Sequence, residues 1–264
     1  MGAGGLERGI ARIQRWRWQD GQVRAEEDEV AVEAPLQINL AGEPFLVTMR
    51  TPGDDAALTL GLLYAEGLIR DVDDVAAIAP CGEPGRAAVD VRPGPGVVFE
   101  DPRQRQGAVS SACGICGRDQ IDDLLARIPV VKGAIAPRPL EAAIPALEAV
   151  QPRFARTGSL HAAVILDETG ETLASAEDIG RHNAVDKAVG VLLRERKRGA
   201  VLGVSGRASF DIVQKAAVAR LRAVVAVSGP SSLAVELASE AGIVLAGFAR
   251  GDGMNIYTHI DRLR

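Results

Sequence analysis

Aromatic residues and long apolar stretches are scarce in this chain of 264 residues. Aromatic side chains make up only 3% of the sequence, although apolar residues reach 47%. The core must therefore consist mainly of Ala, Val, Leu and Ile, a composition typical of sheets covered by helices. The longest apolar runs, such as Ala223 to Val227, are far too short to cross a bilayer, so we expect no membrane segment.

A surplus of positive charge is also missing. The formal net charge is −5, which argues against nucleic acid or an anionic membrane surface as a partner. Any anionic ligand would have to be held by local donors rather than by a global field.

Cysteine is rare as well, with only Cys81, Cys113 and Cys116. An odd number of cysteines is a poor disulfide framework in a chain of this size. The first ten residues lack the apolar stretch of a signal peptide. We therefore expect a cytoplasmic protein, in which cysteines are more often catalytic, redox-active or metal-binding than structural.

The sequence pattern changes near residue 105. Residues 1–28 are polar and charged and predict a flexible N-terminal arm, whereas residues 29–105 predict a small α+β subdomain. Residues 106–264 alternate apolar strands with amphipathic helices, which predicts an α/β domain built on a parallel sheet with right-handed crossovers. The strands expected there are 161–166, 200–204, 223–227 and 243–246, and the helices are 119–127, 183–194, 210–221 and 233–241.

Three of these strands end in small, turn-forming residues. The loops are Ser205 to Ser209, Ser228 to Ser232 and Gly247 to Gly253. Ligands of open α/β sheets bind beyond the carboxyl ends of the strands, where free N–H groups favour anions. Arg207 and Arg250 could form forked bonds to phosphate. One such loop is more often a plain turn with a helix cap, but three on one edge favour a phosphate site.

Cys113 and Cys116 lie in a glycine-containing loop just before a predicted helix. A helix start and a neighbouring thiol both lower the pKa of a cysteine. Because the thiolate is the form that attacks sulfur, this loop suits sulfur relay or disulfide exchange. We interpret Cys113 as the sulfur-bearing residue.

Other interpretations of the two cysteines stay open. A four-cysteine zinc knuckle would need a second Cys-x-x-Cys, which is absent, but a mixed site with His161 or His182 is conceivable. A thioredoxin-like site would place the pair after the first strand of a βαβ unit, not in mid-chain. Inert buried cysteines are disfavoured by the neighbouring glycines and serines.

A polar run from Glu177 to Lys187 precedes a predicted helix. It is either a capped helix start with solvated charges and a structural histidine, or one wall of a site. In the second interpretation, Arg181, His182 and Asn183 face a ligand.

These segments together resemble the formate dehydrogenase accessory protein family (FdhD, a family of sulfur carriers). The similarity extends from about residue 30 to the C-terminus. The matching stretches are Ser110 to Arg118, Thr157 to His161, Glu177 to Lys187, Ser205 to Lys215 and Gly247 to His259.

The resemblance implies a sulfurtransferase. Family members accept sulfur as a persulfide from a cysteine desulfurase and pass it to the bis(molybdopterin guanine dinucleotide) molybdenum cofactor, which formate dehydrogenase requires. The family's persulfide cysteine falls on Cys113 and the second cysteine of its pair on Cys116. The cofactor is bound as substrate, and no resident metal is expected. The expected cofactor-binding residues, including the loops described above, are Phe248, Ala249, Arg250, Gly251, Asp252, Gly253, Ser205, Gly206, Arg207, Ser228, Gly229 and His182.

The resemblance also implies a cytidine deaminase-like α/β/α domain with a smaller N-terminal subdomain, and a homodimer. Ala112 departs from the serine expected before the first cysteine. A zinc-dependent hydrolase is the rival function, but it needs His-x-Glu followed by Pro-Cys-x-x-Cys. Here the order is reversed, and the segment His161 to Ala163 lacks the glutamate. A non-catalytic chaperone for the molybdenum cofactor is the other alternative.

Overall fold

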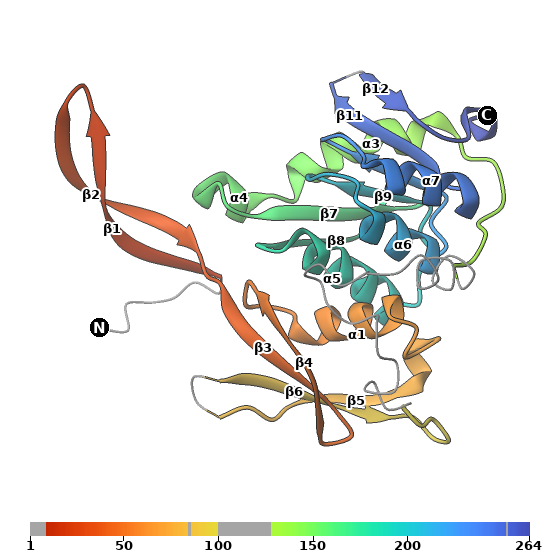
Figure 1. Cartoon of the computed structure of the whole chain (residues 1–264), viewed down its shortest axis with the longest axis horizontal. Helices are drawn as coiled ribbons and strands as arrows, with labels where there is room; N and C mark the ends of the chain where they lie inside the picture. The colour runs from red at the N-terminus through yellow and green to blue at the C-terminus, as the bar shows by residue number, and fades with distance from the viewer. Residues whose placement is uncertain (1–8, 84–85, 100–127, 252) are drawn as a thin grey trace.

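The computed structural model describes residues 9–83, 86–99, 128–251 and 253–264. Within these residues the chain forms a two-stranded ribbon, a four-stranded sheet in the order β4-β3-β6-β5, and a six-stranded sheet in the order β12-β11-β10-β9-β7-β8 (Figure 1). Cys113, Cys116, Asp252 and the predicted helix 119–127 lie outside the described residues.

The first half of the chain supplies the ribbon and the smaller sheet. Its elements are β1 (Ile10–Gln19), β2 (Gln22–Ala31), β3 (Ala34–Leu40), β4 (Glu43–Arg50), α1 (Asp55–Ala65), the short 3₁₀ helix Val72–Asp74, β5 (Val75–Pro80) and β6 (Ala87–Pro93).

The second half supplies the larger sheet and its helices. Its elements are α3 (Pro137–Ala149), α4 (Pro152–Thr157), β7 (His161–Leu166), β8 (Thr172–Asp178), α5 (Arg181–Arg194), β9 (Val201–Val204), α6 (Phe210–Val218), β10 (Ala223–Ala226), α7 (Ser232–Ala241), β11 (Val244–Arg250), β12 (Gly253–Ile256) and the 3₁₀ helix Ile260–Arg262.

Most of the expected N-terminal arm is regular structure. β1 and β2 pair without interruption from Ile10 opposite Ala31 to the turn, and the ribbon projects from the body (Figure 1). Most of its residues are exposed on both faces. Apolar alternation is confined to a short stretch near the turn, where Trp16 and Trp18 lie opposite Ala25 and Val23, and this is a weak signal for strands of ten residues. At its base, the guanidinium of Arg156 on α4 donates from Nε and Nη2 to the two carboxylate oxygens of Glu29, each over 2.7 Å.

The smaller sheet packs against α1 through one face. Leu36, Ile38 and Leu40 of β3 are buried together with Leu58 and Leu63 of α1. The spacing of two along the strand brings all three β3 side chains to the same side. β3 and β4 form a hairpin, and α1 begins a few residues after it.

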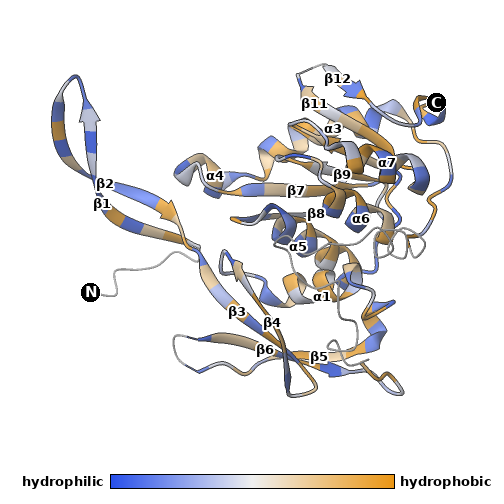
Figure 2. Ribbon diagram, viewed as in Figure 1, coloured by the Kyte–Doolittle hydropathy of each residue, from blue (hydrophilic) through white to orange (hydrophobic). Residues whose placement is uncertain are grey.

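The larger sheet is buried on both faces. Along β7, Ala163 and Ile165 belong to one core cluster, while Ala162, Val164 and Leu166 belong to the other. Helices α5, α6 and α7 cover the first side and α3 covers the second. Figure 2 shows the resulting hydrophobic stripe along β7 and β9. Burial on both faces explains why these strands appear in the sequence as continuous apolar runs.

The expectation of a parallel sheet is wrong for part of the sheet. Strands β9, β10 and β11 are parallel, but β7 runs antiparallel to both β8 and β9, and β12 antiparallel to β11. β7 and β8 are joined by the turn 167–170, which is too short to hold a crossover helix. The sheet is therefore mixed, with its parallel strands in the middle.

The two halves of the chain meet where α1 crosses α5 (Figure 1). A Cβ atom added at Gly61 would collide with the backbone oxygen of Asp186, and one added at Gly190 would collide with that of Ala57. Two glycines thus let the helix backbones touch. Because the backbones touch, even a methyl group at this crossing would push the helices apart.

We predict that Gly190→Ala destabilises the protein by about 1–3 kcal/mol, the usual cost of overpacking, although alanine normally favours a helix over glycine. Equilibrium urea unfolding measures the difference. Glu141→Ala on the exposed side of α3 is the matched control and should change stability by less than about 0.5 kcal/mol. A Gly190→Ala protein as stable as wild type would show that the helices do not make this close contact.

Candidate functional site

The structure brings the three predicted loops together at one edge of the larger sheet. The amide of Ser228 donates to the carbonyl of Gly206 over 3.4 Å, and the amide of Phe248 donates to the carbonyl of Ser228 over 3.3 Å. Because β9, β10 and β11 are parallel neighbours, their carboxyl ends must lie side by side. The order of the loops across the edge follows the order of the strands.

His161 joins this edge because β7 runs the opposite way. The first residue of an antiparallel strand lies next to the last residues of its neighbour, and His161 accordingly faces Gly206: a Cβ atom at Gly206 would lie 3.4 Å from Nδ1 of His161. Partial burial, followed by the charges of Arg181 and Arg207, lowers the pKa of His161. The neutral imidazole is therefore favoured beside two arginines.

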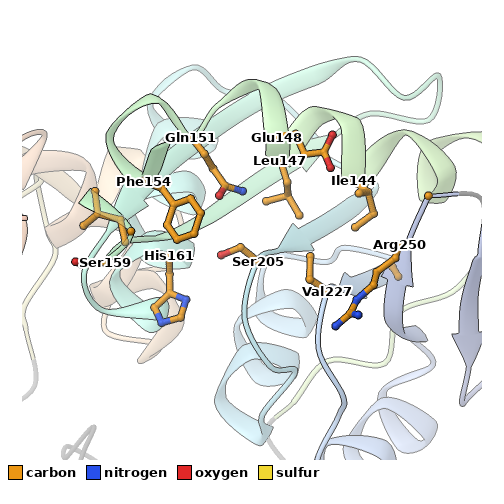
Figure 3. A pocket seen from close by; sticks show the side chains of 14 residues that line it. Ile144, Leu147, Glu148, Gln151, Phe154, Ser159, His161, Ser205, Val227 and Arg250 are labelled. Carbon is orange, nitrogen blue, oxygen red and sulfur yellow. The ribbon is translucent and has the colours of Figure 1, made fainter. Parts of the chain in front are cut away.

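A cavity of about 460 Å³ opens on the α3 side of this edge. Ile144, Leu147 and Phe154 form its apolar wall, and Arg250 and His161 enter it from the sheet edge (Figure 3). Ligand sites in proteins usually enclose roughly 300–1,000 Å³ with apolar walls and a few polar groups. This cavity has the size and the composition to hold a planar, polar ring.

Ser205 lies between His161 and Arg250 in this cavity (Figure 3). Its Oγ accepts a hydrogen bond of 2.9 Å from the amide of Ala162. The hydroxyl hydrogen stays available, because accepting that bond uses only an oxygen lone pair. Ser205 can therefore donate to an anion without giving up its structural bond.

The segment from Gly247 to Arg250, which was expected to be a loop, is the end of β11 and carries backbone strain at a β-bulge. Phe248 has φ 52°, a left-handed conformation that is costly for an aromatic residue, and its side chain is exposed. The Phe248 ring packs over Gly229, where an added Cβ atom would lie 2.8 Å from the ring. Strain of this kind collects at functional sites. Between the exposed Phe248 and Arg250, Ala249 is buried.

Beneath the edge lies a buried polar network centred on Asp178. Its carboxylate accepts hydrogen bonds from Lys187 Nζ at 2.6 Å, from the amide of Thr51 at 3.1 Å and from the amide of Gly180 at 2.9 Å. Asn183 donates from Nδ2 to the same carboxylate and to the carbonyl of Met49. Of the two interpretations of the run Glu177 to Lys187, the one in which Asn183 faces a ligand is therefore wrong for this residue, because its amide joins the two halves of the chain.

His182 lies at the start of α5, where Nε2 is 3.4 Å from Oδ2 of Asp211. Burial, followed by the charge of Arg181, lowers its pKa to about 4. The ring is thus neutral at neutral pH.

Two other residues considered in the sequence analysis are exposed. The side chain of Arg207 is open to solvent, whereas that of His182 is partly buried. Cys81, the one cysteine among the described residues, is exposed on the smaller sheet and lies outside this site.

The α3–α4 wall of the cavity was missed by the sequence analysis. The sequence did contain signals for these two helices, because Pro137 and Pro152 each occupy the first turn of a helix, a preferred place for proline.

No cluster of three or more metal-ligating side chains occurs among the described residues. In the same part of the chain, no helix is both long and apolar enough to span a membrane.

The fold and the edge geometry define an α/β protein with a candidate small-molecule site at the sheet edge, lined by Ser205, His161 and Arg250. The chain belongs to the FdhD/NarQ family, whose model matches residues 31–264. This match confirms the resemblance found in the sequence.

Curated relatives carry the same family name over nearly their whole length. A "Sulfur carrier protein FdhD" from Anaeromyxobacter dehalogenans is 49% identical over 255 residues, covering 89% of this chain and 88% of the relative. Proteins of that name from Streptomyces avermitilis and Mycobacterium tuberculosis are each 43% identical, covering 94% and 92% of this chain and 93% and 94% of the relatives.

A solved structure shares the fold. It is described as a formate dehydrogenase accessory protein from Desulfotalea psychrophila, with a TM-score of 0.77 and 22% identity, covering 97% of this chain and 100% of that one. At this level of identity the likeness concerns the fold alone.

We predict that Lys187→Met lowers the free energy of unfolding by about 3–5 kcal/mol, because it leaves the buried Asp178 carboxylate without its cation. The control is Arg194→Met, which breaks an exposed ion pair with Asp54 and should cost less than about 1 kcal/mol. Urea unfolding of both variants gives the comparison. Similar losses in the two proteins would mean that Asp178 is not buried as described.

We predict that the ring of His182 titrates with a pKa of about 4 in NMR spectra. Because this value lies below the unfolded value of about 6.5, the stability that depends on a neutral His182 is complete above pH 6.5 and declines as the pH falls towards 4. Arg181→Met should raise the pKa part of the way, since burial remains. A wild-type pKa near 6.5 would show that His182 is open to solvent.

Proposed function

We propose that this protein is a sulfur carrier that accepts sulfane sulfur on Cys113 from a cysteine desulfurase. It then passes the sulfur to the molybdenum of bis(molybdopterin guanine dinucleotide) for use by formate dehydrogenase. The family match and the names of the curated relatives support the carrier role. The observation that carries the cofactor half of the proposal is the cavity where Arg250, Ser205 and His161 meet.

The cavity suits a guanine nucleotide on three grounds. Its volume of about 460 Å³ is large enough for a purine ring. Its aliphatic lining residues and Phe154 offer apolar contact to such a ring. Arg250, as a planar cation with several donors, matches a phosphate group. The cofactor is the substrate in this proposal, and binding of its nucleotide end in the cavity would position the whole molecule on the protein.

The sulfur steps follow from thiol chemistry. The Cys113 thiolate attacks the outer sulfur of the donor's persulfide; a new S–S bond forms, and the donor leaves as a thiolate. Cys116 then attacks the inner sulfur, which forms a Cys113–Cys116 disulfide and releases hydrosulfide toward the metal. A dithiol reductant restores the pair. Cys116 is thus the resolving residue of the proposal.

The remaining features of the proposal come from the family resemblance. They are a cytidine deaminase-like arrangement of residues 106–264, a smaller subdomain over residues 29–105, a homodimer and a cytoplasmic location. The strand order β12-β11-β10-β9-β7-β8, with helices on both faces, is compatible with an α/β/α domain.

We predict that incubation with a cysteine desulfurase and cysteine adds one sulfur atom to the peptide containing Cys113, as measured by intact and peptide mass spectrometry. Cys113→Ala should abolish the addition. Cys81→Ala is the matched control, because it removes an exposed cysteine of the smaller sheet, and it should keep the full signal. Persulfide on wild type that survives Cys113→Ala would disprove the assignment, and no persulfide at all would favour a cofactor chaperone.

We predict that Arg250→Ala weakens binding of guanosine diphosphate about tenfold to a hundredfold, the loss of one charge-assisted hydrogen bond to phosphate. Isothermal titration calorimetry measures it directly. Arg92→Ala, which removes an exposed arginine on β6, should leave the affinity unchanged. Equal affinities for wild type and Arg250→Ala would remove Arg250 from the site.

A further inference from the structure

One wall of the cavity is formed by a helix that is not anchored in the core. α4 and the residues at its two ends contribute Gln151, Phe154, Gly158 and Ser159 to the cavity lining. None of the six residues of α4, all of which the structure describes, is buried. Helices shorter than roughly 12–15 residues are marginal in water by themselves. Since hydrophobic burial contributes little here, polar contacts must keep α4 in place.

A buried carboxylate of strand β8 holds the N-terminal end of α4. Both oxygens of Glu177 accept hydrogen bonds from the first turn of the helix, Oε2 from the amide of Arg153 at 3.2 Å and Oε1 from the amide of Phe154 at 2.8 Å. These are two of the amides that a helix leaves unpaired at its start, and negative charge is favoured at that end. Because Glu177 is only 7% exposed, water competes little for the two bonds.

Glu177 takes the place of a cap from the helix itself. The N-cap residue of α4, Gln151, makes no side-chain bond to the first turn. In α1 and α7, by contrast, the N-cap residues Asp54 and Ser231 each accept a bond from an amide of their own helix. These two helices carry their caps with them. The position of α4 depends instead on where β8 places the Glu177 carboxylate.

The C-terminal end of α4 is tied to the base of the ribbon. There the guanidinium of Arg156 donates to both carboxylate oxygens of Glu29. The two side chains are 37% and 25% exposed, so this ion pair is open to solvent and contributes less than a buried bond. Two carboxylates from two different elements thus hold α4, and Phe154 lies on the stretch between them.

We propose that Glu177 is a positioning residue for the ligand cavity, with Glu29 as its weaker counterpart. Neither carboxylate is among the residues that line the cavity. Each acts through α4, which brings Phe154 to the cavity (Figure 3). Without Glu177 the first turn of α4 would detach from β8, and the apolar wall would be formed only part of the time. This role of Glu177 needs no ligand, whereas its consequence for a bound nucleotide rests on the proposed function.

Glu177→Gln in the full-length protein tests the buried bonds with little change of shape. The amide oxygen can still accept one hydrogen bond but carries no charge, and the amide nitrogen cannot accept the second. Hydrogen exchange of the peptide that contains residues 151–159, followed by mass spectrometry, should become about tenfold faster, the loss of one hydrogen bond to a charged group. Exchange in β7 and β9 should stay as in wild type, because α4 contributes no buried residue to the core.

The affinity for guanosine diphosphate, measured by calorimetric titration, gives the consequence for the ligand. Glu177→Gln should weaken it, because part of the protein then lacks a complete cavity wall. The matched control is Glu171→Gln, which neutralises an exposed carboxylate just before the same strand and should change neither exchange nor affinity. Glu29→Gln should change both in the same direction by at most about fivefold, as expected for an exposed ion pair. Because Glu29 lies at the surface, this variant supplies the test if Glu177→Gln does not fold.

Faster exchange confined to residues 151–159, together with weaker binding, supports the proposal. Wild-type exchange in this peptide would overturn it, and so would faster exchange throughout the larger sheet, which would show that Glu177 stabilises the fold as a whole. Faster exchange of α4 with unchanged affinity would refute the link between the helix and the ligand.

These outcomes are separable from those of the proposed function. A wild-type protein that binds no guanosine diphosphate refutes the proposed nucleotide site, whereas exchange in α4 still decides whether Glu177 holds the helix. Nucleotide binding that is insensitive to both Glu177→Gln and Glu29→Gln keeps the nucleotide site and refutes the positioning role. Formation of the Cys113 persulfide is measured by mass and bears on neither.

Discussion

The site geometry depends on the hydrogen bonds and the ion pair that the buried carboxylate of Asp178 accepts. It receives the cation of Lys187 and backbone amides from both halves of the chain, Thr51 after β4 and Gly180 before α5. A buried charge is stable only when such partners surround it. These bonds fix where β8 ends and where α5 begins, and thereby place Arg181 and His182 at the sheet edge.

Strand direction then decides what meets at that edge. β9 and β10 end in turns that contain glycine and serine, and β11 ends at Arg250. β7 runs the other way and begins at the same edge with His161. Beginnings and ends of strands thus meet in one place. A sheet of entirely parallel strands would have put His161 at the opposite edge, away from Arg250 and the cavity.

An acidic protein can still be a binder of anions, because the relevant charge is local. The chain has a net charge of −5, but within the described residues the arginines at positions 181, 207 and 250 all lie around this one edge, with half-buried histidines whose lowered pKa values keep them neutral. Fields at distances above about 10 Å are screened by salt. Short-range donors and glycine turns can therefore select a phosphate where net charge would repel it.

The sequence by itself determined the core strands, the helices between them, the turns after β9 and β10 and the family, because these depend on local patterns of apolar, glycine and serine residues. The third expected loop, from Gly247, is strand as far as Arg250. Only the tertiary structure decided the antiparallel direction of β7, the hydrogen bond of the Asn183 side chain to the Met49 carbonyl rather than to a ligand, and the α3–α4 wall of the cavity. It also separated Ser209 from Ser231, two serines in similar contexts of which only the second caps its own helix. These features depend on contacts between residues far apart in the chain, such as Met49 with Asn183, and no local pattern encodes them.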